Sequence, residues 1–180
     1  MNKAEYLLLK ARVEDSMKQL SYYEDRLRAA GLIPFSAENK YEKLGLDEDE
    51  IYRIVGSILC DYYTELENII KVVISTIHVI NELDERELLE IAVLPVEGYR
   101  PKIISKEAFN RAEEYLGFRY AFTRNYSVIR KKDRAYQLVK ELQVLNELLK
   151  EDIDEFIGIM DSVIIVWTLN YLVYKQKKMI

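Results

Sequence analysis

Apolar residues recur at spacings of three and four along most of this chain, which predicts amphipathic helices rather than strands. The first such stretch predicts a helix from about Lys3 to Ala30. Gly31 is a favourable residue to end it and Pro34 prevents its continuation, so residues 35–46 are expected to form a loop. The apolar stripe of this helix comprises Leu9, Val13, Met17, Leu20, Tyr23 and Leu27.

A second, longer helix is predicted to begin at Asp47, because consecutive acidic residues suit the positive end of a helix dipole. It should end near Asn81 or Asp84. A short helix is predicted over residues 85–92, and prolines and a glycine make residues 93–104 irregular. The stripe of the long helix comprises Ile51, Val55, Ile58, Tyr62, Leu66, Ile69, Val73, Ile77 and Ile80.

Two further long helices complete the pattern. Ser105 is a suitable N-cap for the third, which should end near Val128. Residues 130–134 have the composition of a charged connection, and the fourth helix is expected over about 133–160. Four antiparallel helices with short connections predict an all-α fold, an up-and-down bundle formed by residues 1–161.

Residues 162–180 are predicted to form an apolar C-terminal extension. The 13 residues from Ser162 to Tyr174 carry no charge, and this run is too short to span a bilayer as a helix. The extension is therefore expected to be a helix that packs on the bundle or on a dimer partner. A membrane anchor with a Lys-rich flank and an added strand are the alternatives.

Composition narrows the classes of function. The 180 residues are 49% hydrophobic and 32% charged, as in a globular domain, and the net charge is −5. One cysteine favours a reducing, cytoplasmic setting, and one histidine excludes sites that need two. The acidic residues 47–50 lack the glycine and distal glutamate of an EF-hand loop. No metal and no cofactor are predicted.

A basic segment stands out in this acidic chain. Residues 111–134 hold seven basic and three acidic residues, a local charge of +4, with tyrosines and a phenylalanine between them. Such a segment can hold RNA by phosphate contacts and stacking. The alternative is a solvated helix end whose cations suit the helix dipole. The candidate RNA-binding residues are Arg119, Arg124, Arg130, Lys131, Lys132 and Arg134.

The same segment resembles the third helix of HEPN domains, in particular the HepT-like toxins. The motif there is an arginine, four residues, a histidine, one residue and a tyrosine, often after a phenylalanine, and Phe118, Arg119 and Tyr126 match it. Residues 99–105 and 61–67 resemble the flanking HepT-like sequences. The resemblance covers roughly residues 5–160.

The resemblance implies a homodimer of helical bundles, metal-independent RNA cleavage in a basic cleft shared by two subunits, and no cofactor. It also implies a nucleotidyltransferase antitoxin as partner, which in some systems adds AMP to the motif tyrosine, here Tyr126. The alternative role of Tyr126 is ordinary packing, as for many of the 14 tyrosines.

The chain departs from the motif at the histidine, where Arg124 stands, or Asn125 if the gap is one residue longer. Cleavage at a 2′-hydroxyl needs a group that accepts and returns a proton near neutral pH, which neither residue supplies. The expected function is therefore a HepT-like toxin–antitoxin component that binds RNA and is a weak or inactive ribonuclease. The alternatives are an active enzyme that uses Arg119, Asn125 and Tyr126, and a non-catalytic interaction bundle. His78, on the second helix, is expected to be structural.

Overall fold

The computed structural model describes residues 2–33, 45–77, 83–124 and 129–177; the side chains of residues 129–131 and 165–177 are not among its described parts. Within these ranges the chain is mainly helical, residues 93–104 are irregular as predicted, and the only β-type pairing is an isolated bridge between Val96 and Arg100. The helices are α1 (Lys3–Ala29), α2 (Glu48–Ile77), α3 (Glu85–Ala92), α4 (Lys106–Thr123) and α5 (Ile129–Lys177).

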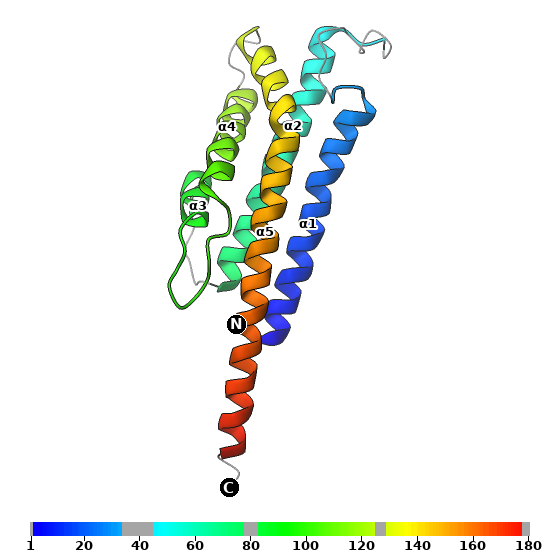
Figure 1. Ribbon diagram of the computed structural model, residues 1–180. Helices are drawn as coiled ribbons and strands as arrows, with labels where there is room; N and C mark the ends of the chain where they lie inside the picture. Colours follow the sequence, from blue (N-terminus) through cyan, green and yellow to red (C-terminus); the bar gives the residue numbers. More distant parts are fainter. Residues whose placement is uncertain (1, 34–44, 78–82, 125–128, 178–180) are drawn as a thin grey trace.

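The four long helices run alternately up and down, as Figure 1 shows, and this confirms the predicted all-α bundle. Helix α2 lies at the centre, because it contacts each of the other four helices. The short helix α3 packs on α2 and α4 at one side. The predicted RNA-binding segment at the end of α4 therefore lies against the central helix.

Helix α1 has a well-defined cap at each end, and the glycine at its C-terminal end was predicted. Asn2 caps the N-terminus, with its side chain accepting the Glu5 N–H at 3.0 Å and the Glu5 carboxylate accepting the Asn2 N–H at 2.7 Å. At the other end Gly31 has φ of +73°, a conformation that glycine adopts without strain. The Leu32 N–H then reaches the Leu27 carbonyl at 2.9 Å, which closes the helix.

Helix α2 begins as predicted, with reciprocal 2.8 Å hydrogen bonds between Asp47 and Glu50. Its centre is tied to two other helices through one amide. The Tyr62 hydroxyl donates to Asn146 Oδ1 on α5 at 2.8 Å, and Asn146 Nδ2 donates to Glu24 on α1 at 2.7 Å. Tyr62 is fully buried, so this chain of bonds satisfies a polar group in the core and fixes the register of α1, α2 and α5.

Two predicted boundaries were wrong. Helix α4 ends at Thr123 and not near Val128. Helix α5 begins at Ile129, so residues 130–134 are its first turns and not a charged connection. Arginine and lysine are good helix formers. The ion pairs that Lys132 makes with two acidic residues at the start of α2 anchor this first part of α5.

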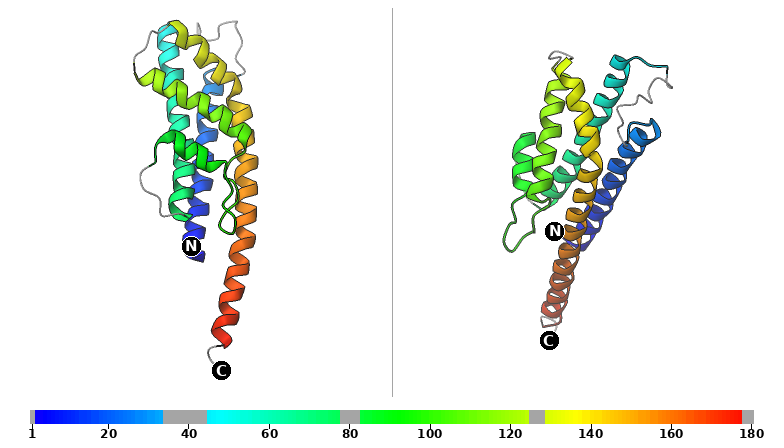
Figure 2. Two further views of the ribbon diagram at one scale, coloured as in Figure 1. Left: turned by 90° about the vertical axis from the view of Figure 1, so that its left-hand side faces the viewer. Right: turned by 45° about the horizontal axis from the view of Figure 1, so that its top comes forward.

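Helix α5 also continues without a break past residue 161 to Lys177. Its last turns project beyond the bundle in all the views of Figures 1 and 2. At the base of this projection, Asp161 accepts hydrogen bonds from the Tyr6 hydroxyl at 2.8 Å and from Lys10 at 2.9 Å. In the described residues, we find no helix with the length and hydropathy needed to cross a membrane.

Gly56 generates a stability prediction. A Cβ at this position of α2 would overlap the ring of Phe122 on α4, which stacks on Phe118 with centroids 5.6 Å apart. We expect Gly56→Ala to lower the free energy of unfolding by about 1–2 kcal/mol, although alanine gains about 1 kcal/mol in helix propensity. Urea unfolding of the variant measures this.

The matched control is Gly117→Ala on α4, where an added Cβ has open space. This variant should be more stable than the native protein by about 1 kcal/mol. Equal stabilisation by both substitutions would contradict the close packing of α2 on the end of α4.

Candidate functional site

The start of α4 is fixed at two points, which sets the position of the motif residues further along. The Ser105 side chain caps the helix by accepting the Ala108 N–H at 3.2 Å. The Ser105 N–H donates at 2.7 Å to Asp152, a nearly buried carboxylate on α5. Three turns later, the buried Tyr115 hydroxyl donates to the Leu138 carbonyl of α5 at 2.7 Å. Helix α4 is thus held in register against α5.

One turn beyond Tyr115, Arg119 points into an ion-pair cluster formed by three helices. Its Nη1 lies 2.9 Å from Glu67 Oε2 on α2 and 3.1 Å from Glu85 Oε1 on α3. Glu67 is buried, with 4% of the residue exposed, and its other carboxylate oxygen pairs with Lys71. The two carboxylates and the two cations balance, so the cluster is neutral as a whole.

Two tyrosines complete the surroundings of Arg119. The guanidinium carbon lies 5.6 Å from the ring centroid of Tyr63, a cation–π distance. Tyr63 is fully buried, and its hydroxyl has no hydrogen-bond partner in the described parts of the chain. Burial and the charge of Glu67 raise the pKa of Tyr63. A hydrogen bond to Glu85, and then partial burial, raise the pKa of Tyr120 to about 12.

This arrangement defines what Arg119 can do chemically. Burial acts to lower its pKa, but the hydrogen bond to Glu67 and the charge of Glu85 outweigh burial and raise the pKa above the ordinary arginine value. The guanidinium therefore stays protonated and cannot serve as a general base. It can stabilise negative charge, but one of its nitrogens is already shared between two carboxylates.

Arg124 takes a different position. It follows the last residue of α4, and its N–H closes the helix by donating to the Tyr120 carbonyl at 3.2 Å. Its guanidinium carbon lies 5.3 Å from the Tyr120 ring centroid, and the residue is exposed. Arg124 has no carboxylate partner in the described part of the chain. Tyr120 thus lies between the two arginines in contact terms: its ring is near Arg124, and its hydroxyl bonds to Glu85, which pairs with Arg119.

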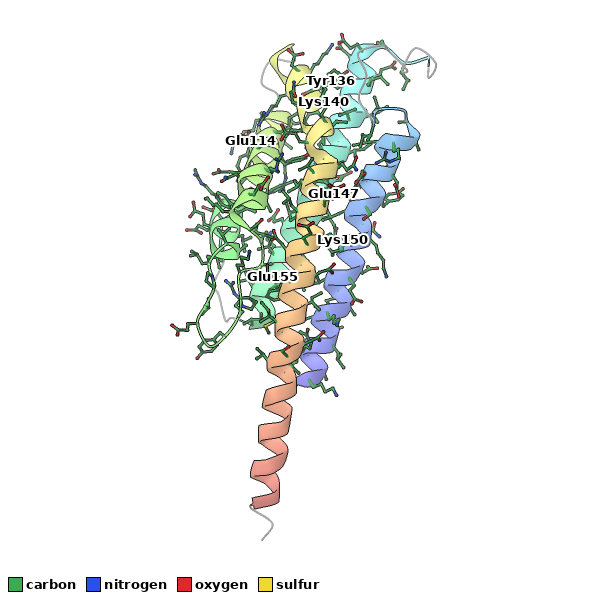
Figure 3. All side chains as sticks on the ribbon, viewed as in Figure 1. Glu114, Tyr136, Lys140, Glu147, Lys150 and Glu155 are labelled. Atoms are coloured by element: carbon green, nitrogen blue, oxygen red, sulfur yellow. The ribbon has the colours of Figure 1, made fainter. Side chains whose placement is uncertain are left out.

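The other described cations of the predicted RNA-binding set are paired. Lys132 lies 3.0 Å from Glu48 and 2.5 Å from Asp49, and its hydrogen bonds to both raise its pKa. Arg134 pairs with Glu114 of α4, which Figure 3 labels. Glu48 and Asp49 lie outside residues 111–134 and offset part of the local positive charge, whereas Glu114 lies within that range and is already counted in it.

Several predicted positions lie outside the described residues. Asn125 and Tyr126 fall in the range between α4 and α5, and His78 falls in the range after α2. The side chains of Arg130 and Lys131 are also outside the described set, although both residues belong to α5. The assignments of catalysis to Asn125, of modification to Tyr126 and of RNA contacts to the two cations remain predictions.

Sequence reasoning missed the carboxylate partners of Arg119. Glu67 follows the helical spacing of the buried residues Tyr63 and Ile70, so a charged residue stands on an apolar face. A buried charge needs a partner, so this position was a detectable signal for a cation on another helix. Glu85, near the start of α3, gave no comparable signal, because acidic residues are common in a first helical turn.

The described residues give little support to a metal site or to a nucleophilic cysteine. Among the described residues there is no group of three or more histidine, cysteine or acidic side chains placed to hold a metal ion. Burial raises the pKa of the Cys60 thiol to about 11, which keeps it protonated at neutral pH. A groove of about 600 Å³ lies between α1 and α5, with Glu147 and Lys150 in its lining, both labelled in Figure 3.

Comparison with known protein families shows to which family the chain belongs. A model of the HepT-like protein family matches residues 54–160, which is more than half of the chain and includes the whole Arg119 cluster. The chain belongs to the HepT-like protein family. The comparisons with curated proteins and with solved structures gave no match. The HepT-like match leaves out α1 and the last turns of α5.

The buried carboxylate generates the prediction for this site. We expect Glu67→Gln to lower the free energy of unfolding by about 2 kcal/mol, because the amide keeps the shape but leaves the Arg119 guanidinium without its nearest anion. Lys71→Gln is the matched control: this lysine is half exposed, and its loss should cost less than about 1 kcal/mol. Chemical denaturation measures both. A Glu67→Gln protein as stable as the native one would show that carboxylate burial costs as much as the pairing gains.

Proposed function

We propose that this HepT-like protein is a toxin–antitoxin component that contacts RNA weakly and has little or no ribonuclease activity. The observation that carries the proposal is the engagement of Arg119 by Glu67 and Glu85. The arginine that the family motif would direct at RNA is committed here to a neutral cluster inside the chain. The protein therefore retains the motif arginine as part of its fold.

The proton-transfer side of the reaction supports the same proposal. Arg124 occupies the motif histidine position and carries a group that does not titrate near neutral pH. Both tyrosines beside Arg119 have raised pKa values, so neither is a base at neutral pH. RNA cleavage without a metal needs a proton acceptor and a proton donor in the cleft. The two carboxylates beside Arg119, which could accept a proton, are held in ion pairs with it.

The proposed partner is a nucleotidyltransferase, as for HepT-like proteins generally. Family membership supports this assignment, and the proposed acceptor of AMP is Tyr126. Tyr126 follows the exposed Arg124 by two positions. A nucleotidyl group there would bring negative charge next to the cations that contact RNA, and would weaken phosphate binding. In this proposal the modification weakens RNA binding, so it has an effect even if the protein does not cleave RNA.

A metal-free cleavage assay tests the catalytic part of the proposal. In EDTA the native protein and Arg119→Lys, which keeps a cation opposite both carboxylates, should leave RNA intact. Arg124→His should gain cleavage at least tenfold above background, with a rate that depends on pH near the histidine pKa, because it restores a titratable group. Cleavage by the native protein that Arg119→Lys reduces a hundredfold would overturn the proposal.

A second candidate function is a pure interaction bundle, and the ion pairs of Lys132 and Arg134 favour it. Salt dependence of RNA binding separates the two. With both cations held on carboxylates, at most Arg124, Arg130 and Lys131 contact phosphate, which gives a slope of log affinity against log salt of about −2 for single strands.

We expect Arg124→Ala to reduce that slope by about 0.7 and Lys132→Ala to leave it unchanged. Filter binding or fluorescence anisotropy with a single-stranded RNA at several salt concentrations measures the slope. A slope of about −4 or steeper would mean that the whole segment contacts phosphate. Absence of binding at low salt would leave the interaction bundle as the function.

A further inference from the structure

The groove between α1 and α5 is crossed by hydrogen bonds at both ends and is open between them. At one end, Asp161 of α5 accepts hydrogen bonds from Tyr6 and Lys10 of α1 at 2.8 and 2.9 Å. At the other end, Asn146 of α5 donates to Glu24 of α1 at 2.7 Å. Between these crossings, no hydrogen bond or ion pair joins the described residues of the two helices. The groove has a volume of about 600 Å³, and the span from Lys10 to Glu24 makes it about 21 Å long.

The floor of the groove is apolar in this open stretch. It is formed by Met17 of α1 and by Ile153 and Ile157 of α5. Ile153 is buried, whereas Met17 and Ile157 are only partly buried. Removing apolar surface from water is favourable, so a partner that covers the floor gains free energy from doing so.

The walls of the groove carry four charged side chains without an ion-pair partner among the described residues. Glu14 and Lys18 belong to α1, and Lys150 and Asp154 belong to α5. All four are exposed, and Figure 3 shows Lys150 on the side of α5 next to α1. The remaining charged side chains of the lining have partners within the chain; they are Lys10, Glu24 and Glu147.

The four unpaired charges are ordered along the groove. Helices α1 and α5 run antiparallel, so the two acids both lie toward the Lys10 end and the two lysines both lie toward the Glu24 end. On each wall the acid and the lysine are four residues apart, which is about 6 Å along the helix axis. The open stretch is therefore negative toward one end and positive toward the other.

We propose that this groove binds an amphipathic helix of a partner protein, with basic side chains opposite the two acids and acidic side chains one turn away, opposite the two lysines. A helix fits the length, because about 14 helical residues span 21 Å. It satisfies its own backbone hydrogen bonds, whereas an extended segment finds no strand edge here to pair with. Side chains four positions apart on a helix also match the spacing of charges on the walls.

The groove is separate from the Arg119 cluster. Its walls are α1 and α5, whereas the cluster is formed by α2, α3 and α4. One wall, α1, also lies outside the residues that the HepT-like family model matches. A helix in this groove leaves the cluster uncovered, and the inference does not depend on the function proposed above.

Three helical peptides of about 18 residues test the inference, each with the same leucine stripe on an alanine background. Beside the stripe, the first has two lysines on one turn and two glutamates on the next. The second has lysine at all four positions, and the third has glutamate at all four. We expect the mixed peptide to bind the full-length protein about tenfold more tightly than either of the others, measured by fluorescence anisotropy. The net charge of −5 would by itself favour the four-lysine peptide, so this order reports on the groove.

Variants of the protein locate the site. Lys18→Glu combined with Lys150→Glu makes all four wall charges negative, so the mixed peptide should lose about tenfold in affinity and the four-lysine peptide should gain about tenfold. Arg12→Glu combined with Arg26→Glu is the matched control. Both arginines are exposed on α1 outside the groove lining, and the change in net charge is the same. This control should leave the order of the three peptides unchanged.

Three results would refute the inference. A mixed peptide that binds no more tightly than the four-lysine peptide would show that the groove does not select a helix with this charge pattern. An unchanged order of peptides in the Lys18→Glu, Lys150→Glu variant would place the binding elsewhere. A change in the sedimentation coefficient of that variant without any peptide would show that a second copy of the chain already covers the groove.

Discussion

The buried carboxylate of Glu67 is the constraint that determines how the helices around the candidate site meet. It lies on the central helix with 4% of the residue exposed, so its charge requires compensation within the bundle. Arg119 on α4 provides one compensating positive charge, and its guanidinium also pairs with Glu85 at the start of α3. Lys71, on the next turn of α2, provides a second positive charge. The short helix α3 and the end of α4 are thereby held against α2 by one shared set of charges.

That constraint also bears on the proposed function of the motif arginine. To act on RNA, Arg119 would have to neutralise Glu67 and stabilise charge on a phosphate at the same time. An incoming phosphate must compete with two fixed carboxylates, and the loss of Arg119 from Glu67 would leave a buried anion uncompensated. A chain that has an arginine in place of the proton-transfer group has no catalytic reason to leave this arginine free. The structural use of Arg119 and the departure at Arg124 therefore favour the same function.

Local patterns in the sequence predicted the fold well, because apolar periodicity and helix caps are local signals. The capping residues Asp47 and Ser105, and the glycine that ends α1, all lie where the sequence placed them. The site was harder to predict, because its charges pair across the fold. Residues 111–134 sum to +4, but Lys132 pairs with Glu48 and Asp49 at the start of α2, more than 80 residues away in sequence. The boundary between a charged connection and α5 was misplaced for the same reason, since those ion pairs are what anchor the first turns.

The length of α5 links the two ends of the molecule. The Arg119 cluster lies near the level at which Tyr115 bonds to Leu138, and 26 residues of α5, about 40 Å, separate Leu138 from Ile164. The charges that hold α3 and α4 against α2 therefore act on one part of the molecule, and the end of α5 that projects from the bundle lies outside their reach.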